Sequence, residues 1–175
     1  MLYSIVFDFC VLTALLAGVL SAVSDYKGLM IPNRYSVIII TSFFVGYGAL
    51  YAGGLHNNIM EPFLLHLAAA AIVFIVTFIM FALNVWGAGD SKLSLAYALW
   101  VGVSGVFGFI MVMTVFGGVL GVVALVLKKK PLWRGAPAGT WIARVQEGEN
   151  VVPYGIAIVA GAFCAFFVQG YWSIW

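Results

Sequence analysis

Two aspartates stand beside long apolar stretches, in the segments Ser24-Asp25-Tyr26 and Gly87-Ala88-Gly89-Asp90. If the fold brings their carboxyl groups together, both cannot ionise cheaply, so the pair shares a proton. The ionised member can then act as a general base on a water molecule, while the protonated member polarises a carbonyl group. Such a pair indicates the chemistry of peptide-bond hydrolysis.

The residues around the two aspartates are also compatible with purely structural roles. Gly87 and Gly89 allow tight backbone geometry and the close approach of an extended substrate. Asp90 can equally be the N-cap of the following helix, and Asp25 can simply face water. The segment is not a nucleotide-binding loop, because no third glycine and no Gly-Lys-Ser/Thr element follows. The histidines and cysteines lack metal-ligand spacing, so the sequence predicts no metal and no cofactor.

The composition places the chain in a membrane. Hydrophobic residues make up 65% of the 175 residues and charged residues only 8%, whereas a soluble domain has ~25% charged residues. So little charge cannot cover a folded domain with polar surface in water. We therefore expect an integral membrane protein that contacts lipid and binds no nucleic acid, with residues 1–175 forming a single transmembrane domain.

Apolar runs and the breaks between them predict an all-α bundle of six transmembrane helices. A run of ~20 apolar residues can span a bilayer as a helix. The region 93–127 is too long for one span, and glycines at 102, 105 and 108 suggest a break inside it. The fourth helix is then shorter than the rest. The predicted helices cover about 3–23, 35–52, 63–85, 91–101, 106–127 and a last stretch that starts near Pro153.

The basic residues orient this bundle. All eight lysines and arginines fall on one side of the predicted topology, in the segments 25–34, 86–92 and 128–152. The positive-inside rule makes that side cytoplasmic. Asp25 and Asp90 then lie at the cytoplasmic face of the inner membrane, and both chain termini lie outside. Asp8 is excluded from the pair, because it lies about 25 Å from Asp25 along the same helix.

Two further predictions concern polar residues away from the aspartates. The segment from Lys128 to Asn150 is polar and rich in Pro and Gly, so we expect it to be mobile or only partly ordered. His66 lies roughly level with Asp8 near the outer face. The two can form a structural pair, although we expect a histidine whose hydrogen bonds are satisfied separately.

Three short motifs accompany the two aspartates in a fixed order. They are Asp25 followed by Ile31-Pro32-Asn33, then Gly87-x-Gly89-Asp90-x-Lys92-Leu93, then Val152-Pro153-Tyr154-Gly155-Ile156-Ala157. This combination resembles the type IV prepilin peptidases, which belong to the GxGD aspartic proteases of membranes.

That resemblance implies an aspartic endopeptidase. It would remove the basic leader of prepilin or pseudopilin substrates at the cytoplasmic face, just after a glycine. The resemblance carries Asp25 and Asp90 over as the catalytic pair of a transmembrane peptidase domain. Support of the active site or of the substrate is expected from Gly87, Gly89, Lys92, Pro32, Asn33, Pro153, Tyr154 and Gly155.

The chain departs from the larger bacterial members of that family in one respect. Those members carry an N-terminal segment with paired CxxC motifs and an N-methyltransferase activity, and this sequence has no CxxC. It looks more like the short, peptidase-only members that process pilins of the tight-adherence (Flp) type, with archaeal preflagellin peptidases as neighbours. We therefore expect no methyltransferase activity.

Two other functions fit the same residues. A small transporter or channel component also has glycine-rich helices and ionisable residues near the membrane, and its aspartates would line a permeation path without touching. A pilus or secretion assembly factor with an inactive site would keep the fold without the chemistry. Carboxyl groups that meet at one place would favour the protease over the transporter.

Overall fold

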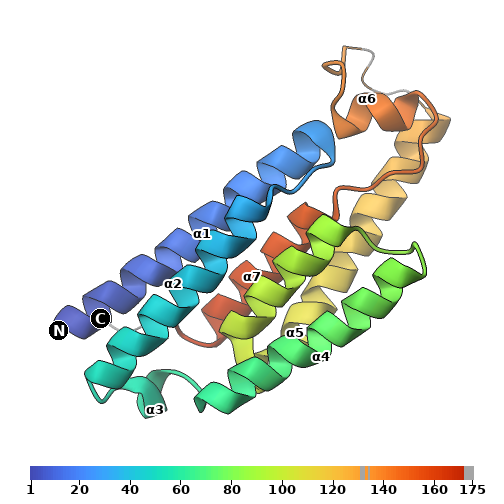
Figure 1. Ribbon diagram of the computed structural model, residues 1–175. Coiled ribbons are helices and arrows are strands. Elements are labelled where there is room, and N and C mark those ends of the chain that lie inside the picture. The colour runs from blue at the N-terminus through green and yellow to red at the C-terminus, as the bar shows by residue number, and fades with distance from the viewer. Residues whose placement is uncertain (131–132, 134, 172–175) are drawn as a thin grey trace.

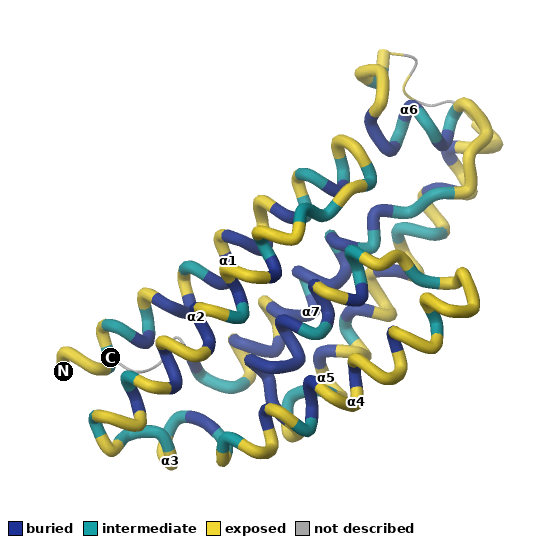
Figure 2. The backbone as a smooth tube through the Cα atoms, viewed as in Figure 1, coloured by how far each residue is buried: buried dark blue, intermediate teal, exposed yellow. Residues whose placement is uncertain are grey.

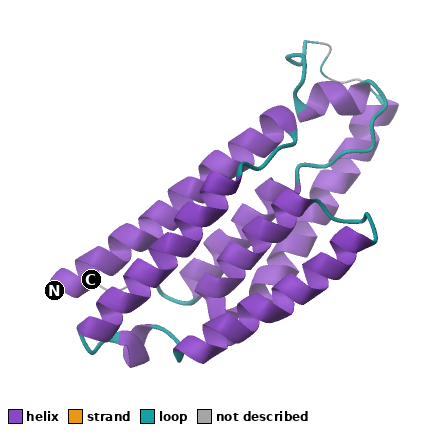
Figure 3. Ribbon diagram, in the orientation of Figure 1, coloured by secondary structure: helices purple, strands orange, loops and turns teal. Residues whose placement is uncertain are grey.

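The computed structural model describes residues 1–130, 133 and 135–171, which form helices and loops (Figure 3). Four of its helices are long and apolar enough to cross a membrane, and α7 is a shorter apolar helix. The predicted all-α membrane bundle is thereby confirmed for the described residues. The helices are α1 (Leu2–Gly28), α2 (Asn33–Ala52), α3 (His56–Ile59), α4 (Phe63–Ala82), α5 (Ala88–Lys129), α6 (Trp141–Gln146) and α7 (Tyr154–Val168).

The helix α5 consists of two arms, because the chain reverses direction inside it. At Gly102 the backbone has φ 63° and ψ −173°, which is not helical. Figure 1 shows the short arm (residues 88–101) running down into the bundle and the long arm (residues 103–129) running back up. The predicted short fourth helix and longer fifth helix therefore exist. The break falls at the first of the three glycines that suggested it.

The short arm lies at the centre of the bundle, where nearly all of its second half is buried (Figure 2). Two large side chains fix it to its neighbours. The Tyr97 hydroxyl donates a hydrogen bond to the Ala14 carbonyl of α1 at 2.9 Å, and Trp100 Nε1 donates to the Ile39 carbonyl of α2 at 2.9 Å. Gly18 of α1 leaves the space that the Tyr97 hydroxyl occupies, since a side chain there would collide with it.

The last three carbonyl groups of the short arm, those of residues 99–101, accept hydrogen bonds from side chains. His66 Nδ1 of α4 donates to the Leu99 carbonyl (2.8 Å). Tyr171 Oη donates to the Trp100 carbonyl (3.0 Å), and Gln169 Nε2 donates to the Val101 carbonyl (2.6 Å). A backbone group inside a bilayer has no water to bind, and each unpaired one costs several kcal/mol. These three side chains therefore supply the hydrogen bonds that the end of the short arm cannot make within its own helix.

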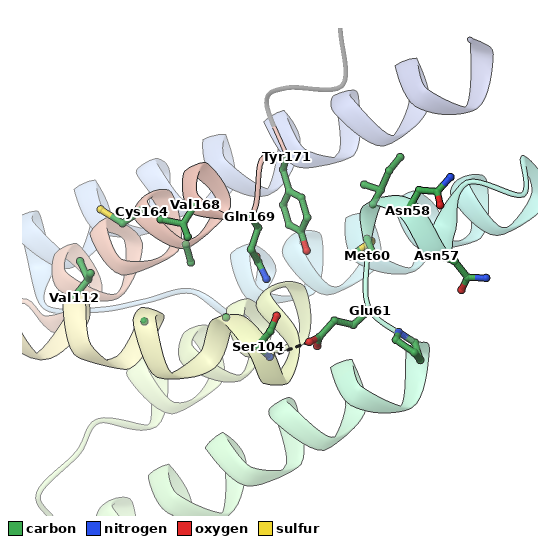
Figure 4. Close-up of a pocket in the computed structure, with 15 residues that line it drawn as sticks. Asn57, Asn58, Met60, Glu61, Ser104, Val112, Cys164, Val168, Gln169 and Tyr171 are labelled. Atoms are coloured by element: carbon green, nitrogen blue, oxygen red, sulfur yellow. Dashed lines mark hydrogen bonds between the residues drawn. The ribbon is translucent and has the colours of Figure 1, made fainter.

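Glu61 serves the other side of the same reversal. Its carboxylate accepts hydrogen bonds from the backbone N–H groups of Val103 (2.8 Å) and Ser104 (3.0 Å), at the start of the long arm (Figure 4). The first N–H groups of a helix have no partner within it, and they favour a negative charge. Glu61 thus binds the free N–H groups at the start of the long arm. His66, Gln169 and Tyr171 bind the free carbonyl groups at the end of the short arm.

Three local predictions need correction. The helix α1 continues to Gly28 rather than ending near residue 23, and it stops where Leu29 adopts the left-handed conformation. The turn-rich segment after α2 contains the short helix α3. The segment 128–150 contains α6, so the prediction of a mobile or partly ordered loop is wrong there. Residues 131, 132 and 134 of that segment lie outside the described residues.

The helix α6 is ordered because its apolar face has a place to pack. Trp141 and Val145 are buried against Leu127 of the long arm of α5 and against Tyr26 of α1. Trp141 Nε1 also donates a hydrogen bond to the Val151 carbonyl at 2.8 Å. The polar composition of the segment concealed these few apolar residues, which are too few to show a helical period.

Candidate active site

Asp25 lies in the last turn of α1, and only 5% of it is exposed. The helix ends because Leu29 adopts the left-handed conformation (φ 52°), with its N–H donating to the Asp25 carbonyl at 2.8 Å. The Ser24 hydroxyl then donates to the Met30 carbonyl at 2.8 Å and holds the turn. This sharp end brings Ile31 back toward the bundle, next to the Asp25 side chain.

Asp90 lies in the first turn of α5, at the same end of the bundle. Gly87 is the N-cap residue of this helix, and its carbonyl accepts the N–H of Ser91 at 3.0 Å. A Cβ atom at Gly87 would stand 2.6 Å from Asp90 Oδ2, so only glycine leaves the carboxyl group its position. At Gly89 a Cβ would stand 3.0 Å from Ile31 Cβ. The two glycines therefore let the loop and the Asp90 carboxyl group pack closely.

The start of α7 supplies a third part of the site. The Gly155 N–H donates a hydrogen bond to Asp25 Oδ2 at 2.8 Å. A Cβ at Gly155 would stand 2.9 Å from the same oxygen and 3.1 Å from Ile31 Cδ1. Three helices that are distant in sequence thus meet around the Asp25 carboxyl group, and glycine at 155 is what allows α7 to approach it.

The two aspartates line one cavity of about 300 Å³, together with residues 29–31 and 87–89. Their carboxyl groups are close enough to interact electrostatically. Neither aspartate forms an ion pair with a described residue. The ion pair found in the described part of the chain joins Arg144 and Glu149. Two like-charged groups without a compensating cation cannot both ionise cheaply, so this geometry favours a shared proton.

The comparison with known protein families agrees with this arrangement. The family model described as the type IV leader peptidase family matches residues 10–122, which is well over half of the chain and includes both aspartates. The chain belongs to the type IV leader peptidase family. It is therefore a multi-pass membrane protein of a protease family whose substrates are prepilin-like. Searches of curated proteins and of solved structures gave no match.

Four other residues predicted for the site are not among those that line the cavity of the two aspartates, namely Lys92, Asn33, Pro32 and Pro153. Lys92 Nζ donates a hydrogen bond to Asn33 Oδ1 at 3.0 Å, which links the short arm of α5 to the start of α2. Pro32 and Pro153 precede α2 and α7 as their N-cap residues. Lys92 and Asn33 therefore connect two of the helices at this end of the bundle, and neither forms an ion pair or a hydrogen bond with the two aspartates.

Tyr154 points away from the aspartates. Its ring lies 4.9 Å from the ring of Trp86, centroid to centroid, and Gly117 of the long arm leaves room for it. Sequence reasoning missed Ile31 as a wall of the site, although Ile31 is in contact range of both Gly89 and Gly155. An isoleucine directly before Pro32 gave no sign of this, because the short apolar run Leu29-Met30-Ile31 does not show which of its side chains turns toward the aspartates.

A larger cavity than that of the aspartates lies at the other end of the bundle. It measures about 690 Å³ and is lined by Glu61, Ser104, Gln169 and Tyr171, among others (Figure 4). The carboxylate in it already accepts two backbone N–H groups, and no second carboxylate lines the cavity among the described residues. This larger cavity therefore lacks the pair of carboxyl groups that the smaller one contains.

Asp8 and His66 do not form a structural pair. His66 is fully buried and binds the Leu99 carbonyl through Nδ1, while its Nε2 has no hydrogen-bond partner among the described residues, so the expectation of a satisfied histidine is met at one ring nitrogen only. Asp8 Oδ2 has no hydrogen-bond partner among the described residues. That described part of the chain also contains no group of His, Cys, Asp and Glu that could hold a metal ion.

Proposed function

We propose that residues 1–175 form a single aspartic peptidase domain that removes the leader peptide of prepilin-like substrates. Asp25 and Asp90 are the catalytic pair. The observation that carries this proposal is their meeting at one small cavity, from helices that are far apart in sequence. A transporter would need a path through the bundle, whereas this cavity sits at one end of it.

The chemistry follows from two carboxyl groups that share one proton. The ionised aspartate takes a proton from a water molecule as the water oxygen attacks the scissile carbonyl carbon. The protonated aspartate gives its proton to the carbonyl oxygen and stabilises the tetrahedral intermediate. Return of a proton to the leaving nitrogen breaks the carbon–nitrogen bond and regenerates the pair. The step consumes one water and needs no cofactor.

The glycines of the site suit a substrate in an extended conformation. Gly87 and Gly155 keep side chains away from the two carboxyl groups, and Gly89 leaves room for Ile31, so a substrate backbone can approach the aspartates. We place this site at the cytoplasmic face, because the basic loops 25–34, 86–92 and 128–152 lie at the same end of the chain's topology. Cleavage there, after a glycine, would release the basic leader into the cytoplasm.

The test is cleavage of a panel of prepilin-like proteins by the purified protein in lipid. We expect a shortened product whose new N-terminus, read by mass spectrometry, begins just after a glycine. Asp8→Asn is the matched control, because it removes a membrane carboxylate far from the cavity and should leave cleavage unchanged. Absence of cleavage of every prepilin, by a protein that is folded and inserted, would contradict the proposal.

A further inference from the structure

An apolar groove opens between α4 and the two arms of α5, on the side of the bundle away from α1. It has a volume of about 400 Å³. Its wall includes Thr77 of α4, Ser94 of the short arm and Met113 and Gly118 of the long arm. We refer to it as the α4–α5 groove. The wall formed by α4 packs mainly against α5, because α5 is the one described helix whose backbone lies close to α4.

The α4–α5 groove runs up to the aspartates. Its end wall is formed by the neighbouring rings of Trp86 and Tyr154. Trp86 directly precedes Gly87, and Tyr154 directly precedes Gly155, whose N–H binds Asp25. Ser94 lies one helical turn after Asp90 on the same face, about 6 Å along the axis. A chain segment in the groove would therefore reach the catalytic cavity within a few residues.

Buried polar groups distinguish this groove from a lipid-facing crevice. Ser94 is fully buried, and its hydroxyl has no hydrogen-bond partner among the described residues. The indole Nε1 atom of Trp86 is also buried and also has no hydrogen-bond partner among the described residues. Burying a polar group without a partner costs free energy, so these two groups are suited to bind a ligand that brings donors or acceptors. Lipid tails have neither.

A second groove serves as a comparison. The α1–α7 groove has the same volume, about 400 Å³, and is lined by apolar side chains and Tyr26. Its described lining offers no such buried polar atoms, so it suits acyl chains. Both volumes hold a few residues rather than a whole helix. A few residues of unwound backbone in a membrane need hydrogen-bond partners, and the α4–α5 groove is the one of the two that provides them.

We propose that the α4–α5 groove binds the apolar segment of the substrate next to the scissile bond, partly unwound, and delivers it to Asp25 and Asp90. This proposal rests on the proposed function, since it assigns that peptidase its substrate channel. The occupant is a peptide segment of apolar side chains whose backbone groups bind Ser94 and Trp86.

The test fills the groove at a position that has room. Gly118 lines it, and a Cβ there meets nothing within 4 Å, so Gly118→Phe adds a ring to the groove without a clash in the protein. Gly121→Phe is the matched control on the same helix, since Gly121 is equally open but does not line the groove. Gly108→Phe likewise fills the large cavity at the other end.

We expect Gly118→Phe to slow cleavage of a membrane-embedded prepilin by roughly tenfold or more and to spare a short soluble peptide that carries only the leader and the scissile bond. The two control variants should stay within about twofold of wild type on both substrates. Full activity of Gly118→Phe on the embedded substrate, or an equal loss in Gly121→Phe, would overturn the proposal. Wild type that cleaves neither substrate would overturn the proposed function itself.

Crosslinking provides a readout that does not depend on turnover. A photoreactive residue at Val76 in the α4–α5 groove should crosslink to a prepilin bound by the Asp90→Asn variant. The same residue at Val19 in the α1–α7 groove should not; both positions are about half exposed, at 52% and 41%. Crosslinks from Val19 without crosslinks from Val76 would reject the α4–α5 groove as the binding site.

Discussion

The two ends of the short arm of α5 use the same kinds of residue in different ways. At its start, Asp90 faces Asp25 across a small cavity. Beyond its end, Glu61 faces the backbone N–H groups of Val103 and Ser104 and accepts both. Glu61 therefore has its negative charge stabilised by the start of a helix. Asp25 receives one backbone N–H, that of Gly155, and faces a second carboxyl group, which disfavours ionisation of both.

The difference shows what decides the role of a carboxyl group in a membrane protein. A carboxylate with two backbone donors is a stable part of the structure, and nothing is gained by moving its proton. Two carboxyl groups without a cation beside them keep a proton that can move between them. Glycine differs likewise between the ends, because Gly102 permits a backbone turn, while Gly155 permits a close approach.

The largest effect should come from the aspartates. Asp25→Asn and Asp90→Asn keep the size of the side chain but remove the mobile proton, so each should lower the cleavage rate by ~10²–10⁴. The double variant should be little slower than either single one, because the pair performs one task. Initial rates on an embedded prepilin measure this. Substantial cleavage by purified, folded Asp90→Asn would rule the mechanism out.

The next largest effect should be on the stability of the fold and should come from Gly102, at the other end of the short arm. Gly102→Ala places a Cβ where φ is 63° and ψ is −173°, against the Glu61 carboxylate and 3.2 Å from His66 Cε1. That backbone region is essentially restricted to glycine, so the free energy of unfolding should fall by about 1–3 kcal/mol. Unfolding in detergent measures it, with Gly108→Ala, which is in open space, as the control. Equal stability of the two variants would contradict the role assigned to the reversal.

The smallest effect should come from Gly155, where glycine is needed for the close approach of α7 to Asp25 and not for an unusual backbone conformation. Gly155→Ala puts a Cβ 2.9 Å from Asp25 Oδ2 and should shift that carboxyl group by a few tenths of an ångström. We expect cleavage to fall roughly tenfold, since misplacing reacting groups by ~1 Å can cost ~10²-fold. Gly28→Ala, in open space at the end of the same helix as Asp25, should have no effect. Identical rates for both variants would mean that α7 does not position Asp25.

Much of this architecture could be read from the sequence because a bilayer restricts the choices. Run length and the one-sided basic residues predicted which segments span the membrane, and therefore that Asp25 and Asp90 share one end of the bundle. The break near residue 102 followed from the length of the apolar region. These predictions depend on the composition of whole segments, which a membrane constrains strongly.

What the sequence concealed depends on single contacts between distant residues. Glu61 stands in a loop before Pro62, where a solvated carboxylate is the ordinary expectation, and only the fold shows that it binds the start of the long arm. Gln169 lies at the end of an apolar helix, and its bond to the Val101 carbonyl has no local signal. The burial of Trp141 against Tyr26 and Leu127 is likewise a property of the assembled bundle.

The reversal at Gly102 also fixes an order of events during synthesis. The short arm leaves the ribosome before Gln169 and Tyr171 have been made, so two of its last three carbonyl groups then lack the donors that bind them in the finished protein. The same late segment brings Gly155, whose N–H binds Asp25. A nascent chain therefore cannot complete either end of the arm until the segment 154–171 has been made and has packed against it.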